Sequence, residues 1–139
     1  MSDLVLPRAN WPSTTEEVRV VQFVLNGEPY LLFEDPKNSP EIFTHDEILK
    51  SRLEMLGLSY EMEESKSHGA RGYMIPSRNG ENYLCPGMGY ANVKDKTANF
   101  EGHSNHYALG ISIPHLARIA ELEIGWKIMY KGLDLRNFI

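Results

Sequence analysis

The sequence predicts an α+β fold: a mostly antiparallel sheet built from hairpins, with two helices packed on one face. Two observations support this class. Runs of β-branched and aromatic residues flank turn dipeptides, and two segments combine capping residues with apolar residues at helical spacing. The chain of 139 residues, 42% of them hydrophobic, has no internal repeat and no linker. Since one core is the default at this length, we expect a single domain over residues 1–139.

The N-terminal segment is expected to be an extended arm over about residues 1–12. Pro7 and Pro12 fall within it, and its apolar residues follow neither helical nor strand periodicity. Three apolar side chains are available to hold the arm against the domain, namely Leu4, Leu6 and Trp11.

The first predicted hairpin comprises residues 18–25 and 30–33 around Asn26-Gly27. This dipeptide tolerates the two positive φ angles of a type I′ turn. A helix over residues 14–25 is the alternative, because Ser13 with Glu16, or Thr14 with Glu17, has capping-box spacing and Gly27 could end a helix. We favour the hairpin because consecutive β-branched residues lose side-chain freedom in a helix.

The first predicted helix begins after Thr44, which has capping-box spacing with Glu47. Gly57 is placed to end it in the left-handed conformation. Its apolar stripe is expected to pack on the sheet, and it consists of Ile48, Leu49, Leu53 and Leu56. Residues 58–62 then alternate apolar and polar side chains, the pattern of a half-buried strand.

The second half of the chain predicts a further hairpin, a strand and a helix. Residues 73–75 and 83–85 flank the turn sequence Ser77-Arg78-Asn79-Gly80. Pro86-Gly87-Met88-Gly89 is interpreted as a turn, and the rest of residues 86–105 gives no clear pattern. Residues 106–111 predict a strand, Ser112 and Pro114 a helix start, Gly125 its end, and residues 126–130 a last strand.

Charge is distributed unevenly along the chain, whose formal net charge is −5. Residues 1–64 hold thirteen acidic against five basic residues, whereas residues 65–139 carry a small positive excess. The acidic first half argues against nucleic-acid binding, which depends on clustered Lys and Arg. It favours another protein, of basic character, as the partner.

We expect a cytoplasmic protein with no membrane contact and no cofactor. No apolar run approaches the roughly 20 residues that a bilayer requires, and the first residues do not resemble a signal peptide. A lone cysteine, Cys85, is typical of a reducing compartment.

The segment Glu101–His106 holds the densest group of functional side chains. Glu101, His103 and His106 could bind a metal ion if the segment is a turn or helix, with Asp95 or His68 as the other possible third ligand. The simpler interpretation places these histidines on a polar loop. His45 is expected to be exposed on the first turn of its helix, and His115 occupies the corresponding position in the second helix.

Cys85 is the second chemical candidate. As a nucleophile it needs a base, which His103 or His106 could provide, with Asn99 or Asn105 orienting the imidazole. Arg71 or Arg78 could then hold an anionic substrate. The structural interpretation is a small apolar side chain in the core, where unpaired cysteines are common.

Two functional hypotheses follow. The first is a small acidic protein-binding module of the inhibitor, immunity or assembly-factor type. The second is a small enzyme with its site in the glycine-rich region 69–110, using Cys85 with His103 or His106, or a histidine-based metal site. A concave site with convergent polar groups and shifted pKa values would favour the enzyme, and an exposed charged or apolar patch the binding module.

Overall fold

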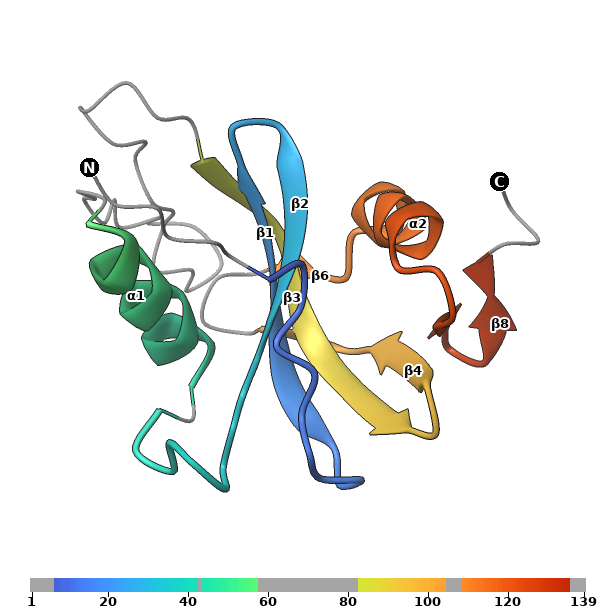
Figure 1. Ribbon diagram of the computed structural model, residues 1–139, viewed down its shortest axis with the longest axis horizontal. Helices are drawn as coiled ribbons and strands as arrows, with labels where there is room; N and C mark the ends of the chain where they lie inside the picture. Colours follow the sequence, from blue (N-terminus) through green and yellow to red (C-terminus); the bar gives the residue numbers. More distant parts are fainter. Residues whose placement is uncertain (1–6, 43, 58–82, 105–108, 136–139) are drawn as a thin grey trace.

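A computed structural model of the chain describes residues 7–42, 44–57, 83–104 and 109–135 (Figure 1). The α+β class is confirmed. Six strands form one sheet in the order β2-β1-β3-β4-β7-β8, antiparallel throughout except for the parallel pair β4 and β7. The strands are β1 (Val18–Leu25), β2 (Glu28–Phe33), β3 (Tyr83–Lys94), β4 (Thr97–Glu101), β7 (Lys127–Tyr130) and β8 (Leu133–Asp134).

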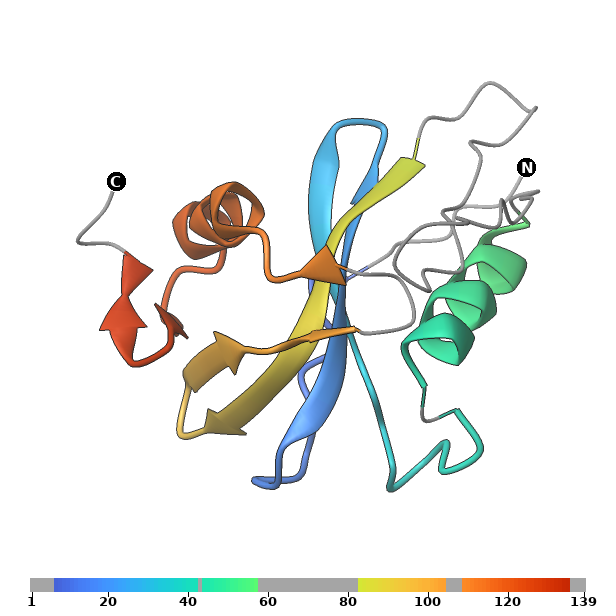
Figure 2. The same cartoon turned by 180° about the vertical axis from the view of Figure 1, so that it is seen from behind.

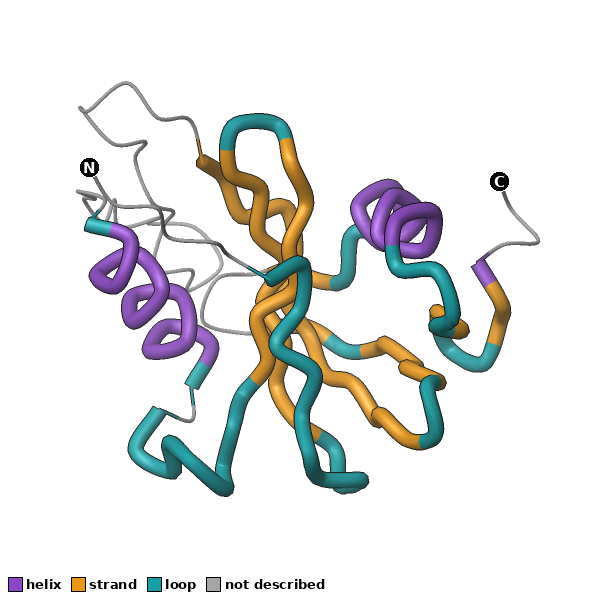
Figure 3. The backbone as a smooth tube through the Cα atoms, in the orientation of Figure 1, coloured by secondary structure: helices purple, strands orange, loops and turns teal. Residues whose placement is uncertain are grey.

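A second, two-stranded sheet pairs β5 (His103–Ser104) with β6 (Leu109–Gly110). The helices are α1 (His45–Leu56) and α2 (Ile113–Leu122). In the part of the chain that the structure describes, no helix is long and apolar enough to span a bilayer. Figure 3 shows short turns between most neighbouring strands, and longer loops before β1 and between β2 and α1.

The first hairpin is confirmed. Asn26 and Gly27 have φ angles of 50° and 83°, as a type I′ turn requires, and Leu25 pairs directly with Glu28. The alternative helix over residues 14–25 is therefore wrong, because β1 occupies residues 18–25.

Residues Pro86–Gly89 do not form the predicted turn but lie inside β3, which pairs with β1 and β4. The glycines permit close packing. A Cβ on Gly89 would lie 2.6 Å from Ile111 Cδ1 and 2.7 Å from the Glu101 carbonyl oxygen, and one on Gly87 would overlap Gln22 Oε1. The glycine-rich sequence here therefore reflects segments packed directly onto the strand.

The two helices lie on opposite faces of the sheet, not together on one face as predicted (Figures 1 and 2). Neighbouring residues of β1 explain this arrangement. Val20 belongs to the cluster that contains Leu116 of α2, whereas Val21 belongs to the cluster that contains Leu53 of α1. Because successive side chains point to opposite faces, apolar runs in the central strands require cover on both sides.

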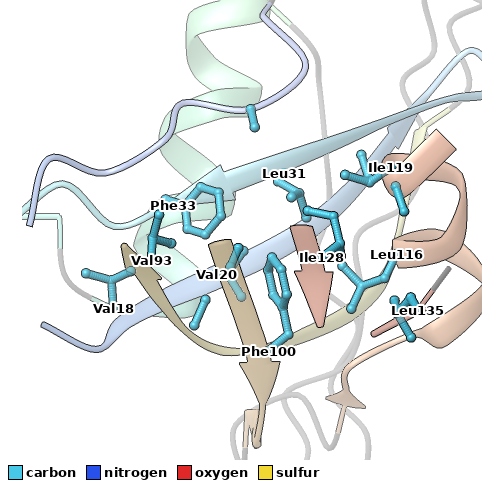
Figure 4. Packing of buried hydrophobic residues seen from close by; sticks show 14 residues of the cluster. Val18, Val20, Leu31, Phe33, Val93, Phe100, Leu116, Ile119, Ile128 and Leu135 are labelled. Atoms are coloured by element: carbon cyan, nitrogen blue, oxygen red, sulfur yellow. The ribbon is translucent and has the colours of Figure 1, made fainter. Parts of the chain in front are cut away.

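The larger core cluster lies between the sheet and α2 (Figure 4). Phe33, Phe100 and Ile128 from three strands belong to this cluster together with Leu116 and Ile119 of the helix. The smaller cluster joins α1 to the other face through Ile48, Leu49 and Leu53, which are buried as predicted, while Leu56 is half-buried.

The helix signals are largely confirmed. Thr44 and Glu47 form both hydrogen bonds of the capping box, and Gly57 has a φ of 72°. Ser112 caps α2, with Pro114 in its first turn. Gly125, with a φ of 95°, follows shortly after the helix ends at Leu122.

The described part of the N-terminal arm lies along the outer edge of β2. Ala9 forms a bridge with Leu31, and the side chain of Asn10 both donates to and accepts from the backbone of Phe33. Trp11 stacks on Trp126 at a centroid distance of 3.7 Å. These contacts cover the unpaired edge of the strand, which would otherwise be open to pairing with another chain.

Several predictions lie outside the described residues. They concern the strand over residues 58–62, and the first strand (residues 73–75) and the turn (Ser77–Gly80) of the second hairpin. They also concern the side chains of Leu4, Leu6, His68, Arg71, Arg78, Asn105 and His106.

Candidate functional site

A hollow of about 410 Å³ lies at the N-terminal end of α1, against the sheet. β1, β3, β5 and the start of α1 contribute its walls, so it exists only because the sheet brings these segments together. The lining residues are Arg19, Thr44, His45, Asp46, Tyr90, His103 and Ser104.

His45 is buried in this hollow, with 6% of its surface exposed, contrary to its predicted exposure. Its Nε2 lies 2.8 Å from the carbonyl oxygen of Gly89. Because a carbonyl can only accept, Nε2 carries the proton and Nδ1 is the basic nitrogen of the neutral ring. Burial, helped by the positive charge of Arg19, lowers the pKa of His45, which keeps the imidazole neutral near pH 7.

Tyr90 forms the wall between His45 and Arg19. The imidazole of His45 packs edge-on against its ring, with an interplanar angle of 84° and a centroid distance of 5.4 Å. The guanidinium of Arg19 lies 5.7 Å from the centroid of the same ring and forms a cation-π contact with it. Gly102, at a φ of 84°, brings backbone so close that a Cβ there would lie 2.9 Å from Tyr90 Cδ1. The tyrosine ring is thus held in place by its neighbours.

Arg19 is oriented by Glu34 of the segment that follows β2. Glu34 Oε1 accepts from the backbone N–H of Arg19 at 2.9 Å and lies 3.6 Å from its Nη1. The guanidinium is therefore partly neutralised, which weakens the hollow as a site for an anion.

Among the residues that the structure describes, His103 is the one predicted site residue that lines this hollow. It is exposed at the rim, on β5, and it faces the same hollow as His45. Glu101 does not line the hollow; it pairs with Tyr90 across the sheet. Among residues 7–42, 44–57, 83–104 and 109–135, no three His, Cys, Asp or Glu side chains are grouped to hold a metal ion.

Cys85 lies at a different place on β3, next to the α1 side of the core. The strand has a bulge here, since Gln22 pairs with Gly87 but Val24 pairs with Leu84. Cys85 precedes Tyr90 by five residues, which corresponds to roughly 15 Å along a strand. The thiol is therefore distant from the hollow that His103 lines.

The surroundings of Cys85 disfavour a thiolate. Its Sγ donates to the carbonyl oxygen of Gly87 at 3.5 Å, and burial raises the pKa of the thiol to about 12. Activated cysteines instead have a lowered pKa, set by nearby positive charge. Asn99, one of the residues expected to orient the base, accepts from the backbone N–H of Gly132 at 2.8 Å and so stabilises a turn.

A second buried histidine, His115, occupies the corresponding place on the other face. Its Nε2 donates to the carbonyl oxygen of Phe23 at 3.0 Å, and its Nδ1 accepts from Gln22 Nε2 at 3.0 Å. Burial lowers the pKa of His115 too. The only sequence signal for this network is Gln22 itself, a polar residue within the apolar run of β1.

Several residues of the acidic first half of the chain lie on the outer face of α1 and on the segment just before it. They surround a shallow hollow of about 510 Å³, lined by Glu41, Ile42, Glu47, Lys50, Ser51 and Glu54. Glu47 is engaged in the capping box, and Lys50 pairs with Asp46 at 3.0 Å. Glu41 and Glu54 are exposed, so these two carboxylates are the most accessible to a partner.

Comparison with models of protein families and with curated proteins gives no match. The described residues form two sites of different character: a hollow with two histidines at the start of α1, and a shallow acidic groove along the outside of the same helix.

Proposed function

We propose that this chain is a small acidic protein-binding module, of the inhibitor, immunity or assembly-factor type, that acts in the cytoplasm. It binds a basic partner through the outer face of α1. The observation that carries the proposal is the groove lined by Glu41, Glu47 and Glu54 together with the apolar side chain of Ile42, with Lys50 as the only basic residue among its lining residues.

The charges of this groove suit a basic ligand. Lys50 is already paired with Asp46, so its charge opposes the groove only weakly. Half-buried Ile42 provides an apolar contact beside the acidic side chains. Interfaces of this kind use the apolar centre for affinity and the charged rim for orientation and association rate.

The test compares two charge-reversal variants with the same net charge. Glu41→Lys with Glu54→Lys alters the groove, whereas Glu16→Lys with Glu17→Lys alters exposed acids before β1. Glu47 is left intact because its reversal would remove the helix cap. The partner is captured by crosslinking to the wild-type chain, and its association rate is then measured at low and physiological ionic strength.

We expect the groove variant to associate with the partner at least about tenfold more slowly than the control variant. Raising the ionic strength should strongly lower the association rates of the wild type and the control, but not that of the groove variant. Equal rates for the two variants would overturn the proposal. So would loss of binding on replacing Ile124, which is 88% exposed beyond α2 and would place the interface elsewhere.

An enzyme remains the second candidate, and the hollow at His45 and His103 favours it. That hollow is lined by the neutral, buried imidazole of His45 and by the exposed imidazole of His103, together with Tyr90. Cys85 takes no part in this version because its pKa is raised. If the wild-type chain turns over a small-molecule substrate, loss of that turnover in a His103→Gln variant with an unchanged free energy of unfolding would support the enzyme hypothesis. Retained turnover in the variant would exclude His103 as a catalytic residue.

A further inference from the structure

A separate hollow of about 160 Å³ lies between α1, the end of β2 and the loop that joins them. Five of its ten lining residues are apolar, namely Leu32, Phe33, Ile42, Ile48 and Met55, and the other five are polar or charged, namely Asn10, Asp35, Ser39, Ser51 and Arg52. The volume is close to the roughly 150 Å³ of an engineered cavity that accepts a benzene ring. An aliphatic or aromatic group of about four to six carbons therefore fits it.

Arg52 supplies the single positive charge among the residues that line this hollow. Its side chain is half-buried, and burial lowers the pKa of the guanidinium, with no charged neighbour contributing to the shift. Within the part of the chain that the structure describes, no ion pair or hydrogen bond of the guanidinium is found. A cation partly removed from water without an opposite charge is unfavourable, so an anion is attracted to it.

Asp35 lies in the same hollow but does not fulfil this role. Its two carboxylate oxygens accept from the backbone N–H and side-chain amide of Asn38, at 3.3 Å and 3.0 Å. Its negative charge also disfavours ligands with more than one negative charge, such as phosphates. The hollow thus combines one available cation, five apolar side chains, three neutral polar side chains and a carboxylate that limits the charge of the ligand.

We propose that this hollow binds a monocarboxylate with a short apolar tail. The carboxylate pairs with the guanidinium of Arg52, whose planar donors suit two carboxylate oxygens, and the tail packs on Leu32, Ile48 and Met55. Such a group can belong to a free carboxylic acid or to the C-terminal leucine of a peptide. This inference does not depend on the acidic groove.

The experiment titrates the full chain, labelled for NMR, with 4-methylpentanoate and with its neutral amide. We expect the acid to shift the Arg52 side-chain signal and the Ile48 methyl signals, and to bind at least about tenfold more tightly than the amide. Acetyl-Gly-Gly-Leu and its C-terminal amide form the second pair. Tighter binding of the peptide acid than of the free acid assigns the site to peptide C-termini, and the reverse order assigns it to free acids.

Arg52→Met keeps the aliphatic stem and removes the charge, and Arg118→Met is the matched control on the exposed face of α2. We expect Arg52→Met to abolish the preference for acid over amide and Arg118→Met to retain it. Equal affinity of acid and amide for the wild type, or shifts centred away from this hollow, would overturn the proposal. The wild-type comparison stands even if Arg52→Met folds poorly.

Discussion

Replacing Gln22 with methionine tests whether the buried polar network fixes α2 to the sheet. Gln22 is fully buried; its Oε1 accepts from Ser112 N at 2.6 Å, and its Nε2 donates to Ser112 O at 2.9 Å and to His115 Nδ1 at 3.0 Å. Methionine has a similar length and shape but forms none of these bonds. The Ser112 N–H and His115 Nδ1 would then lack partners.

Each buried polar group without a partner costs about 1–3 kcal/mol. Two such groups, offset by about 1 kcal/mol from the more apolar side chain, predict a net loss of about 3 kcal/mol in the free energy of unfolding. Urea denaturation at pH 7.5, followed by tryptophan fluorescence, measures this loss because Trp126 follows α2 in the chain and packs against the same core cluster.

Asn92→Met is the matched control, since Asn92 is exposed on β3 and the same change there should alter stability by less than about 0.5 kcal/mol. A Gln22→Met variant as stable as this control would show that the network does not hold the helix. A loss near 3 kcal/mol with an unchanged urea slope would support the reasoning, because the slope reports the surface exposed on unfolding.

Three further predictions follow from the buried groups. Because the pKa values of His45 and His115 are lowered in the folded chain, the unfolded chain binds more protons than the folded chain near and below the ordinary pKa of 6.5. The free energy of unfolding should therefore be highest above that pH and fall as the pH drops from 7.5 to 5.5. A urea midpoint that does not change over this range would contradict the prediction. Leu53→Ala, at a fully buried position, should cost about 2–5 kcal/mol in urea denaturation, and a loss below about 0.5 kcal/mol would refute its packing role. Cys85 should react slowly with iodoacetamide at pH 8 in the folded chain and rapidly in denaturant, because its pKa is raised to about 12; rapid folded-state reaction would restore it as a nucleophile candidate.

The candidate sites were only partly predictable. His103 was identified from its sequence neighbours, and the structure places it at a hollow. Its neighbour there, His45, was expected to be exposed, because nothing in its local sequence indicates that Gly89, 44 residues away, provides the carbonyl it binds. Arg52 belongs to no sequence motif. It became a candidate binding residue only because β2, the following loop and α1 together form the hollow around it.

The features that could be predicted from the amino-acid sequence are those whose energetics are local. Asn26-Gly27 specified the first hairpin through its positive φ angles, and Thr44, Glu47 and Gly57 specified both ends of α1, because a turn or a cap is satisfied within a few residues. Long-range packing, in contrast, causes Pro86–Gly89 to continue a strand and the helices to cover opposite faces of the sheet. Both outcomes depend on groups distant in sequence. Residues 86–89 stay extended because other segments of the chain pack directly on Gly87 and Gly89. The helices cover opposite faces because the central strands have two apolar faces, and the second face is removed from water only by a second helix.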